Sequence, residues 1–264
     1  MVNLLSEHPD PLEKVTDPNN ESVLTEEQQK ELEELVRPYR PHFAANKLGC
    51  ARGVFHHIDT GNSPPFKQSY NSFNPRVMGE AQEELDRRLA LNLVEPSDSP
   101  YSSPLLRLKK KDGKPRWVVD LRKLNDQISS PNANQLPKIN GLLMKIRGAA
   151  IISSLDVRDA YLQIPLDQES RKNTALYVPG RGLFQFTRMP AGLKDAAGRW
   201  QGYIERILGY NANILVYMDD ILCFSPQGGW EHHKALFRHV FDRLVEARLT
   251  VNLEKSVFGH KRTL

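Results

Sequence analysis

The chain has 264 residues, of which 39% are hydrophobic and 26% are charged. This length allows one large domain or two modest ones with a buried core. No segment approaches the ~18 consecutive apolar residues of a membrane span, and the N-terminus lacks a basic-then-apolar secretory pattern. Two cysteines are too few for a disulfide framework or a structural zinc site. Composition therefore predicts a globular protein of a reducing, cytoplasmic compartment.

The charge is unevenly distributed along the chain. Residues 1–40 carry ten acidic and four basic side chains, so the other residues hold 32 basic and 22 acidic ones, a net of +10. The segment Arg107–Lys123 (RLKKKDGKPRWVVDLRK) alone has eight basic and two acidic residues. Such a cluster is typical of phosphate or nucleic-acid contact, although a solvated lysine-rich loop gives the same pattern.

The first third of the chain predicts a leader followed by two helices. Residues 1–24 are polar and proline-containing, which is typical of a disordered leader. Thr25 and Gln28 fit a capping box that opens a helix ending at Pro38. A short β-like piece at Val54–Ile58 lies in an otherwise irregular stretch, and Pro75 is well placed as the first residue of a second helix.

The remaining elements alternate irregularly between strands and helices. A strand precedes Lys109, and Asp112-Gly113 predicts the turn of a hairpin. Further elements are a helix at 139–146, a strand at 150–155, a hairpin turning at 179–182, helices at 193–208 and 230–247, and a final strand at 249–258. Without internal repeats, this order favours an α+β fold around a partly antiparallel sheet.

Two adjacent carboxylates interrupt the apolar run Leu215–Ser225 (LVYMDDILCFS). Its β-branched and aromatic flanks predict two strands, with Asp219 and Asp220 at the tight turn between them. Asp is also an ordinary turn residue, so the pair alone does not decide between a turn and a site. Two like charges this close require a cation to keep both ionised, and Mg²⁺ is the natural candidate because it takes carboxylate oxygens together with substrate phosphates.

A centre that uses two metal ions for phosphoryl transfer needs at least one more carboxylate. Asp156 is the obvious donor, because it ends the apolar run that begins at Ala150. Taken alone, Asp156 fits an ordinary residue at the end of a strand. Together with Asp219 and Asp220, it is better explained as a metal ligand. Three histidines, His232, His233 and His239, have no matching Cys/His cluster and are predicted to lie at the surface.

Several ordered blocks of the chain resemble the reverse transcriptase of Gypsy-type LTR retrotransposons. The blocks are HHIDTGNSPP, LNLVEPSDSPYSSP, KKKDGKPRWVVDLRKLN, LDVRDAYLQIPL, VPGRGLFQF, RMPAGL and YMDDIL, which begin at residues 56, 91, 109, 155, 178, 188 and 217. The resemblance covers about residues 25–260. It implies a right-hand polymerase with fingers and palm. After a lead-in at 25–75, the fingers would comprise residues 76–150 and 162–190, and the palm would comprise residues 150–161 and 191–264.

The resemblance implies an RNA-directed DNA polymerase that adds dNTPs to a primer. Asp156, Asp219 and Asp220 would be the catalytic triad, holding two Mg²⁺ (or Mn²⁺) ions together with the Val157 carbonyl. Lys255 would assist protonation of pyrophosphate. The implied partners are an RNA or DNA template, a primer, and the protease, RNase H and integrase of a Pol polyprotein in a virus-like particle, without a membrane.

The resemblance also implies a set of dNTP contacts. These are Lys110 or, as an equal choice, Lys111, then Arg116, the Asp159 and Ala160 amides, Tyr161 as the ring that excludes a 2′-hydroxyl, and Ala191. For Tyr161, an ordinary core tyrosine is the alternative interpretation.

Three features depart from the family. Ala191 stands where Phe or Gln is usual, and Asp195–Gln201 (DAAGRWQ) stands where NAPATFQ is usual. The chain also ends at Leu264, where the family continues into primer grip, thumb and RNase H, so the thumb is expected to be absent. These departures leave an alternative, a truncated or repurposed retroelement product that binds nucleic acid or protein without extending primers.

Overall fold

The structure is a computed structural model that describes residues 22–44, 46–109, 113, 115–129, 137, 139–226 and 228–260. It contains two compact units, which are described separately. Unit 1 comprises the described residues of Met1–Lys47, Gln135–Arg158 and Gln201–Leu264, and unit 2 those of Leu48–Asn134 and Asp159–Trp200. The lead-in expected at 25–75 is thus divided between the units at Lys47. Lys110, Lys111, Asp112 and most of the expected leader lie outside the described residues.

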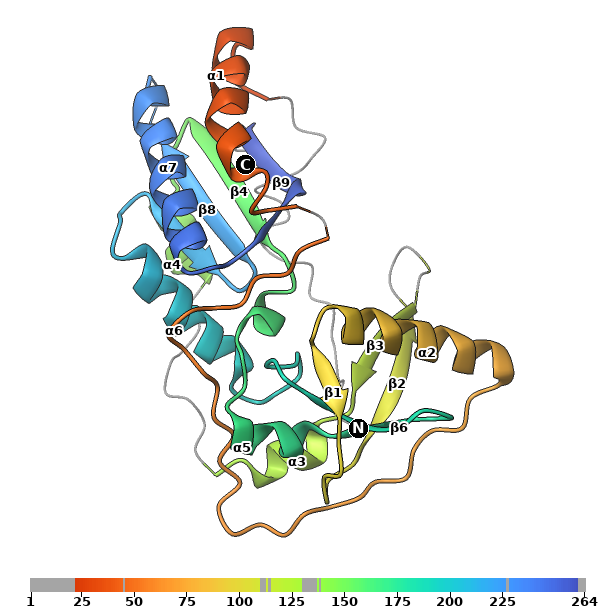
Figure 1. Cartoon of the computed structure of the whole chain (residues 1–264). Coiled ribbons are helices and arrows are strands. Elements are labelled where there is room, and N and C mark those ends of the chain that lie inside the picture. Colours follow the sequence, from red (N-terminus) through yellow and green to blue (C-terminus); the bar gives the residue numbers. More distant parts are fainter. Residues whose placement is uncertain are drawn as a thin grey trace. The chain divides into compact units, whose positions relative to one another are not determined.

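Unit 1 is built on a four-stranded antiparallel sheet in the order β7-β8-β4-β9 (Figure 1). The strands are β4 (Ile151–Val157), β7 (Ile214–Tyr217), β8 (Asp220–Ser225) and β9 (Val251–His260). Its helices are α1 (Glu26–Val36), a 3₁₀ turn at Arg37–Tyr39, α4 (Ile139–Lys145), α7 (Trp230–Glu246) and the end of α6 (Ala196–Leu208). α7 packs on β8, and α1 packs on α7.

The sheet of unit 1 is covered by helices on both faces. Successive side chains of a strand point to opposite faces. Ile152 of β4 packs with Leu142 and Ile146, on α4 and just after it, whereas the next residue, Ser153, hydrogen-bonds with His233 of α7. This double cover explains why β4 is buried at every position except Asp156.

Unit 2 contains a five-stranded sheet in the order β1-β6-β5-β2-β3. The strands are β1 (Val94–Pro96), β2 (Ser103–Lys109), β3 (Pro115–Val119), β5 (Leu176–Val178) and β6 (Gly182–Phe186). The β2–β5 pair is parallel and the others are antiparallel. The helices are α2 (Pro75–Ala90), α3 (Arg122–Gln127), α5 (Gln168–Arg171) and the start of α6, with 3₁₀ turns at Ala160–Gln163 and Lys172–Thr174.

The predicted helix starts are confirmed by their local chemistry. Thr25 and Gln28 form the reciprocal capping box, which satisfies two backbone N–H groups that a helix start leaves without partners. The side chain of Asn74 accepts a hydrogen bond from the Val77 amide, and Pro75 occupies the first helical position, where its missing N–H costs nothing. The hairpins β2–β3, β5–β6 and β7–β8 also form as expected.

Some local predictions are wrong. Val54–Ile58 is not a strand: its only pairing among the described residues is an isolated bridge between His56 and Leu166. The helix expected from residue 193 begins at Ala196, because the preceding turn includes Gly192 at φ +97°. α3 was not predicted, since six residues are too few to show a helical period. No helix in the described part of the chain is long and apolar enough to cross a membrane.

Candidate functional site

The site begins at the ends of β4 and β8, where two carboxylates face each other. Asp156 pairs directly with Asp220 in the antiparallel register, so both side chains project from the same face of the sheet. Both residues are partly exposed, although each is preceded or followed by buried strand positions. Like charges directly opposite destabilise a sheet. The pairing is therefore expected to need a compensating cation.

Asp219 lies in the turn that joins β7 to β8. The turn contains Met218 at φ +52°, a left-handed conformation that is unfavourable for a residue with a side chain. The backbone N–H of Val157 donates to the Asp219 carbonyl over 2.7 Å, which ties the turn to the end of β4. This bond holds the Asp219 main chain beside the end of the strand that carries Asp156.

Gln201 holds the same hairpin from α6, and sequence reasoning did not assign it a role. It is 1% exposed, and its Nε2 donates to the Val216 carbonyl over 2.9 Å and to Glu205 Oε1 over 2.7 Å. Val216 lies two residues before Met218. A polar side chain on the apolar face of α6 was the sequence signal for this contact, because buried amides need partners.

A second polar network joins the sheet to α7 through His233. Its Nε2 hydrogen-bonds with Ser153 Oγ at 2.9 Å and its Nδ1 with Ser225 Oγ at 3.0 Å. Ser153 Oγ also accepts from the Gly259 amide of β9. His233 is fully buried, so its predicted surface position is wrong. Burial, reinforced by neighbouring His232, lowers the pKa of His233 to about 4, and the neutral ring links strands β4 and β8.

Unit 2 holds the residues that the resemblance places near an incoming nucleotide. Asp159 is exposed and has left-handed backbone angles, φ 42° and ψ 51°. Ala160 is buried and begins the 3₁₀ turn that holds Tyr161, which is partly buried. The Tyr161 carbonyl accepts from the Ile164 amide. This partial exposure is compatible both with a ring presented to a sugar and with an ordinary packed tyrosine.

The β2–β3 hairpin carries exposed cations. Arg116 is exposed on β3 opposite Leu108. Arg107 is held by Glu80, with Nη2 and Oε2 2.8 Å apart. Arg116 therefore lies one residue pair before the turn of the hairpin, next to the Lys109–Pro115 pair, whereas Arg107 forms an ion pair with Glu80 of α2. The predicted contacts Lys110 and Lys111 follow β2 directly but lie outside the described residues.

The loop that contains Ala191 is exposed between two buried anchors. Ala191 and Gly192 are exposed, whereas Met189 and Leu193 are 0% and 5% exposed. Lys255, the predicted proton donor, is exposed on β9 of unit 1, three residues beyond Asn252, which pairs with Asp156.

The segment that departs from the family, Asp195–Gln201, is integrated into the fold. Asp195 Oδ1 lies 3.5 Å from His56 Nε2, and both side chains are at least nine-tenths buried. Burial lowers the pKa of His56, against the opposing effect of the Asp195 carboxylate. Arg199 donates to the Phe55 carbonyl over 2.8 Å. Asp195 and Arg199 thus both connect the start of α6 to residues 55 and 56, within unit 2.

The carboxylates of Asp156, Asp219 and Asp220 suit a cation that also takes ligands from the substrate. No group of three or more His, Cys, Asp or Glu side chains able to hold a metal ion occurs among the described residues. Mg²⁺ is usually bound by one or two carboxylates plus substrate phosphates, rather than by an all-protein cage. The carboxylates of Asp156 and Asp220, which are carried by paired strand residues, fit this mode together with Asp219 in the adjoining turn.

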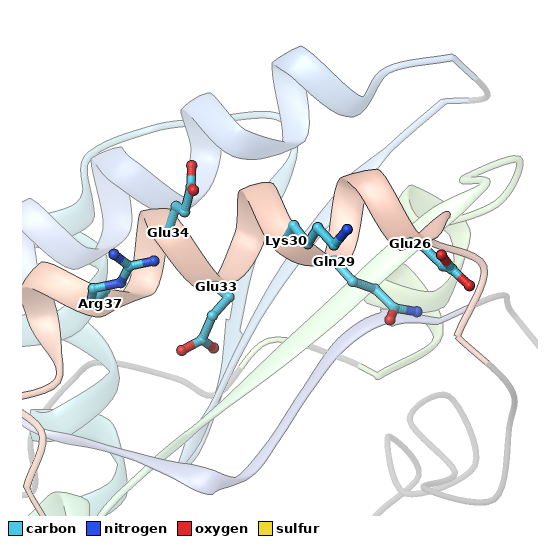
Figure 2. Close-up of a pocket in the computed structure, with 6 residues that line it drawn as sticks. All are labelled: Glu26, Gln29, Lys30, Glu33, Glu34 and Arg37. Carbon is cyan, nitrogen blue, oxygen red and sulfur yellow. The ribbon is translucent and has the colours of Figure 1, made fainter.

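A separate hollow of about 550 Å³ lies along α1 (Figure 2). It is lined by Glu26, Gln29, Lys30, Glu33, Glu34 and Arg37. Figure 2 shows these side chains projecting from α1 and, for Arg37, from the 3₁₀ turn that follows it. Ligand sites are usually concave and mostly apolar, so a charged face of one helix is not assigned as a site.

Comparison with known proteins identifies the family. A family model described as reverse transcriptase (RNA-dependent DNA polymerase) matches residues 108–263, more than half of the chain. The chain belongs to the reverse transcriptase family. The match includes Asp156, Asp219 and Asp220. Reverse transcriptases generally use divalent metal ions.

The similar curated proteins are polyproteins of transposons. This reverse transcriptase domain is 30% identical over 263 residues to the retrovirus-related Pol polyprotein from transposon opus of Drosophila melanogaster, covering 97% of the chain and 24% of that protein. It is 33% identical over 186 residues to the transposon Tf2-3 polyprotein of Schizosaccharomyces pombe, covering 70% and 14%. The chain thus spans a quarter or less of these relatives.

Solved structures show the same fold. The protease-reverse transcriptase of prototype foamy virus is 27% identical, with a TM-score of 0.82 over 90% of this chain and 32% of that one. A foamy viral protease-reverse transcriptase in complex with an RNA/DNA hybrid also has a TM-score of 0.82, at 24% identity, over 90% and 32%. The α+β architecture predicted from the sequence, that of reverse transcriptase fingers and palm, is confirmed.

Proposed function

We propose that this chain is the polymerase domain of a retrotransposon Pol polyprotein and adds dNTPs to a primer on an RNA or DNA template. The observation that carries the proposal is the direct pairing of Asp156 with Asp220, beside a turn that holds Asp219. The match of residues 108–263 to the reverse transcriptase family supports it. So do foamy viral relatives that were solved with double-stranded DNA and with an RNA/DNA hybrid.

The three aspartates are proposed to hold two Mg²⁺ ions, with the Val157 carbonyl as a further ligand. When bound, the ions supply charge compensation for the triphosphate and a lowered pKa for the primer 3′-hydroxyl. The chain itself supplies position. Pairing of β4 with β8 keeps Asp156 and Asp220 on one face, and the Val157–Asp219 bond keeps the turn against β4. A pre-formed arrangement of this kind avoids reorganisation during the reaction.

Unit 2 is proposed to bind the incoming nucleotide. Arg116, with Lys110 or Lys111, would contact the triphosphate, and the Asp159 and Ala160 amides would lie beside it. Tyr161 would lie under the sugar and exclude a 2′-hydroxyl by steric clash.

Lys255 of unit 1 is proposed to protonate the pyrophosphate.

The departures from the family are compatible with this function. Asp195 lies beside His56 and Arg199 donates to the Phe55 carbonyl, both in unit 2, and Gln201 donates to the Val216 carbonyl of β7. Ala191 belongs to unit 2, whereas the three aspartates proposed to bind metal belong to unit 1.

Primer extension tests the proposal. The 264-residue chain is incubated with a template-primer, dNTPs and Mg²⁺, and Asp219→Asn serves as the matched control of nearly unchanged volume. Extension by the wild type that requires Mg²⁺ and is lost in Asp219→Asn supports the proposal. Absence of extension, with retained binding of nucleic acid or protein, favours the alternative of a repurposed fragment.

A further inference from the structure

Asn125 of α3 uses both ends of its side-chain amide on one distant loop. Its Nδ2 donates to the Gly192 carbonyl over 2.8 Å, and its Oδ1 accepts from the Lys194 amide over 2.8 Å. The partners are 67 and 69 residues away in sequence. An amide that both donates to and accepts from one short segment fixes the position and the orientation of that segment.

The backbone that carries Asn125 is well anchored. Leu124, its neighbour, is completely buried, and the backbone N–H of Asn125 donates to the Leu121 carbonyl over 2.8 Å. At the start of α3, Asp120 accepts hydrogen bonds from the backbone and the guanidinium of Arg122. The Arg122 side chain holds the pKa of Asp120 below its usual range, so this contact persists at neutral pH.

The segment that Asn125 holds has few other constraints. Ala191, Gly192 and Lys194 are exposed. Gly192 has φ +97°, and nothing lies within 4 Å of the position that a Cβ would take there. A glycine in open space samples many conformations, so the buried neighbours Met189 and Leu193 alone do not determine how the loop lies.

We propose that Asn125 is a positioning residue for nucleotide binding, because it fixes the main chain that presents Ala191. The inference rests on the proposed function, in which unit 2 binds the incoming dNTP, and on Ala191 being one of the dNTP contacts that the resemblance implies. Ala191 offers only a methyl group, so the placement of its backbone, rather than a long side chain, determines the surface that meets the nucleotide. Asn125 does not touch the nucleotide itself.

Two variants of Asn125 separate the two hydrogen bonds. Asn125→Ala removes both, whereas Asn125→Asp retains an acceptor for the Lys194 amide and loses the donor to Gly192. Hydrogen exchange at the Lys194 backbone amide reports its hydrogen bond to Asn125 directly. This exchange is expected to accelerate in Asn125→Ala and to remain slow in Asn125→Asp. Gln127→Ala is the matched control, because Gln127 lies on the same helix and its amide donates to the Pro64 carbonyl instead.

Nucleotide binding is measured without chemistry. The wild type, Asn125→Ala and Gln127→Ala are bound to a template-primer that lacks the 3′-hydroxyl, and dTTP with Mg²⁺ is titrated opposite a template A. Loss of two net hydrogen bonds from Asn125 should weaken dTTP binding about fivefold to thirtyfold in Asn125→Ala. Affinity for the template-primer should change little, which a general structural defect would not allow, and the fall in melting temperature is compared with that of Gln127→Ala.

The outcomes distinguish this inference from the proposed function. A wild type that binds no dTTP contradicts the proposed function. A wild type that binds dTTP, with Asn125→Ala within twofold of it, contradicts the inference alone. The inference also fails if Gln127→Ala weakens dTTP binding as much as Asn125→Ala, or if exchange at Lys194 is the same in wild type and Asn125→Ala.

Discussion

Each unit contains a short segment that carries a proposed site residue, and the two segments are held in place differently. In unit 1 this segment is the turn that contains Asp219, and in unit 2 it is the loop that contains Ala191. Both contain a residue with left-handed backbone angles, Met218 at φ +52° and Gly192 at φ +97°. A side-chain amide supports each of them: Gln201 donates to Val216 of β7, two residues before Met218, and Asn125 donates to Gly192.

The difference lies in what else holds each segment. The Asp219 turn joins two strands and is tied to β4 through the Val157 amide, so a residue with a side chain is held in an unfavourable conformation. The Ala191 loop has no strand pairing in the described structure and uses glycine, which adopts positive φ without strain. The carboxylates are thus attached to paired strand ends, whereas the proposed nucleotide contact is attached to a loop that is held by Asn125.

The largest effect is expected at the turn that contains Asp219. Asp219→Asn should reduce primer extension by about 10³-fold or more, because it removes a charge from the proposed metal site while leaving volume almost unchanged. Circular dichroism and melting temperature should stay close to wild type. Extension within tenfold of wild type would show that the turn does not carry the chemistry.

His233 makes unit 1 sensitive to acid. Its pKa is about 4 in the folded chain against 6.5 ordinarily, so the unfolded chain binds more protons between these values and stability falls as pH decreases from 6.5 to 4. The loss between pH 7 and 4.5 should be roughly 2–3 kcal/mol. His233→Gln should lack this component in urea unfolding at the two pH values. An equal loss in the variant would assign the acid sensitivity to other groups.

Gln201→Leu tests the amide that supports the Asp219 turn. It leaves the buried Val216 carbonyl without this partner, which should cost about 1–3 kcal/mol of unfolding free energy and lower kcat for extension more than it raises the KM for dNTP. Urea unfolding and steady-state kinetics measure the two effects. If kcat is unchanged while stability falls, Gln201 supports the fold and not the turn.

Gly192→Ala tests the loop that contains Ala191. A Cβ would meet no atom within 4 Å, so only the strain of positive φ opposes it, at about 1–2 kcal/mol. We expect a lower melting temperature and a raised KM for dNTP, with little change in kcat. Gly148→Ala in unit 1, also at positive φ and in open space, is the control that should leave KM unchanged.

The smallest effect is expected at the exposed rim of unit 2. Arg181 and Asp86 form an ion pair of 2.8 Å with side chains 35% and 59% exposed. Such surface pairs contribute about 0–1 kcal/mol, so Arg181→Ala should change the melting temperature by only a degree or two. A larger change would mean that the β5–β6 hairpin depends on this contact with α2.

Sequence by itself predicted the elements that depend on local chemistry. The capping box at Thr25, the helix start at Pro75 and the strands around Asp219 follow from residue type and spacing, because their partners lie within a few positions. The expected meeting of Asp156 with Asp220 also agrees with the strand register. Each apolar run that ends in a carboxylate is an ordinary feature by itself, but the two runs together predicted this pairing across a long separation.

Only the tertiary structure decided which polar side chains hold the site. His233 was expected at the surface, yet it is buried between Ser153 and Ser225, and Gln201 and Asn125 were assigned no role. Apart from the Glu205 carboxylate that Gln201 contacts, their partners are backbone atoms or hydroxyl groups up to 80 residues away, which no local periodicity reveals. A buried polar group finds its partner through the packing of whole elements, and this packing is specified by the complete chain.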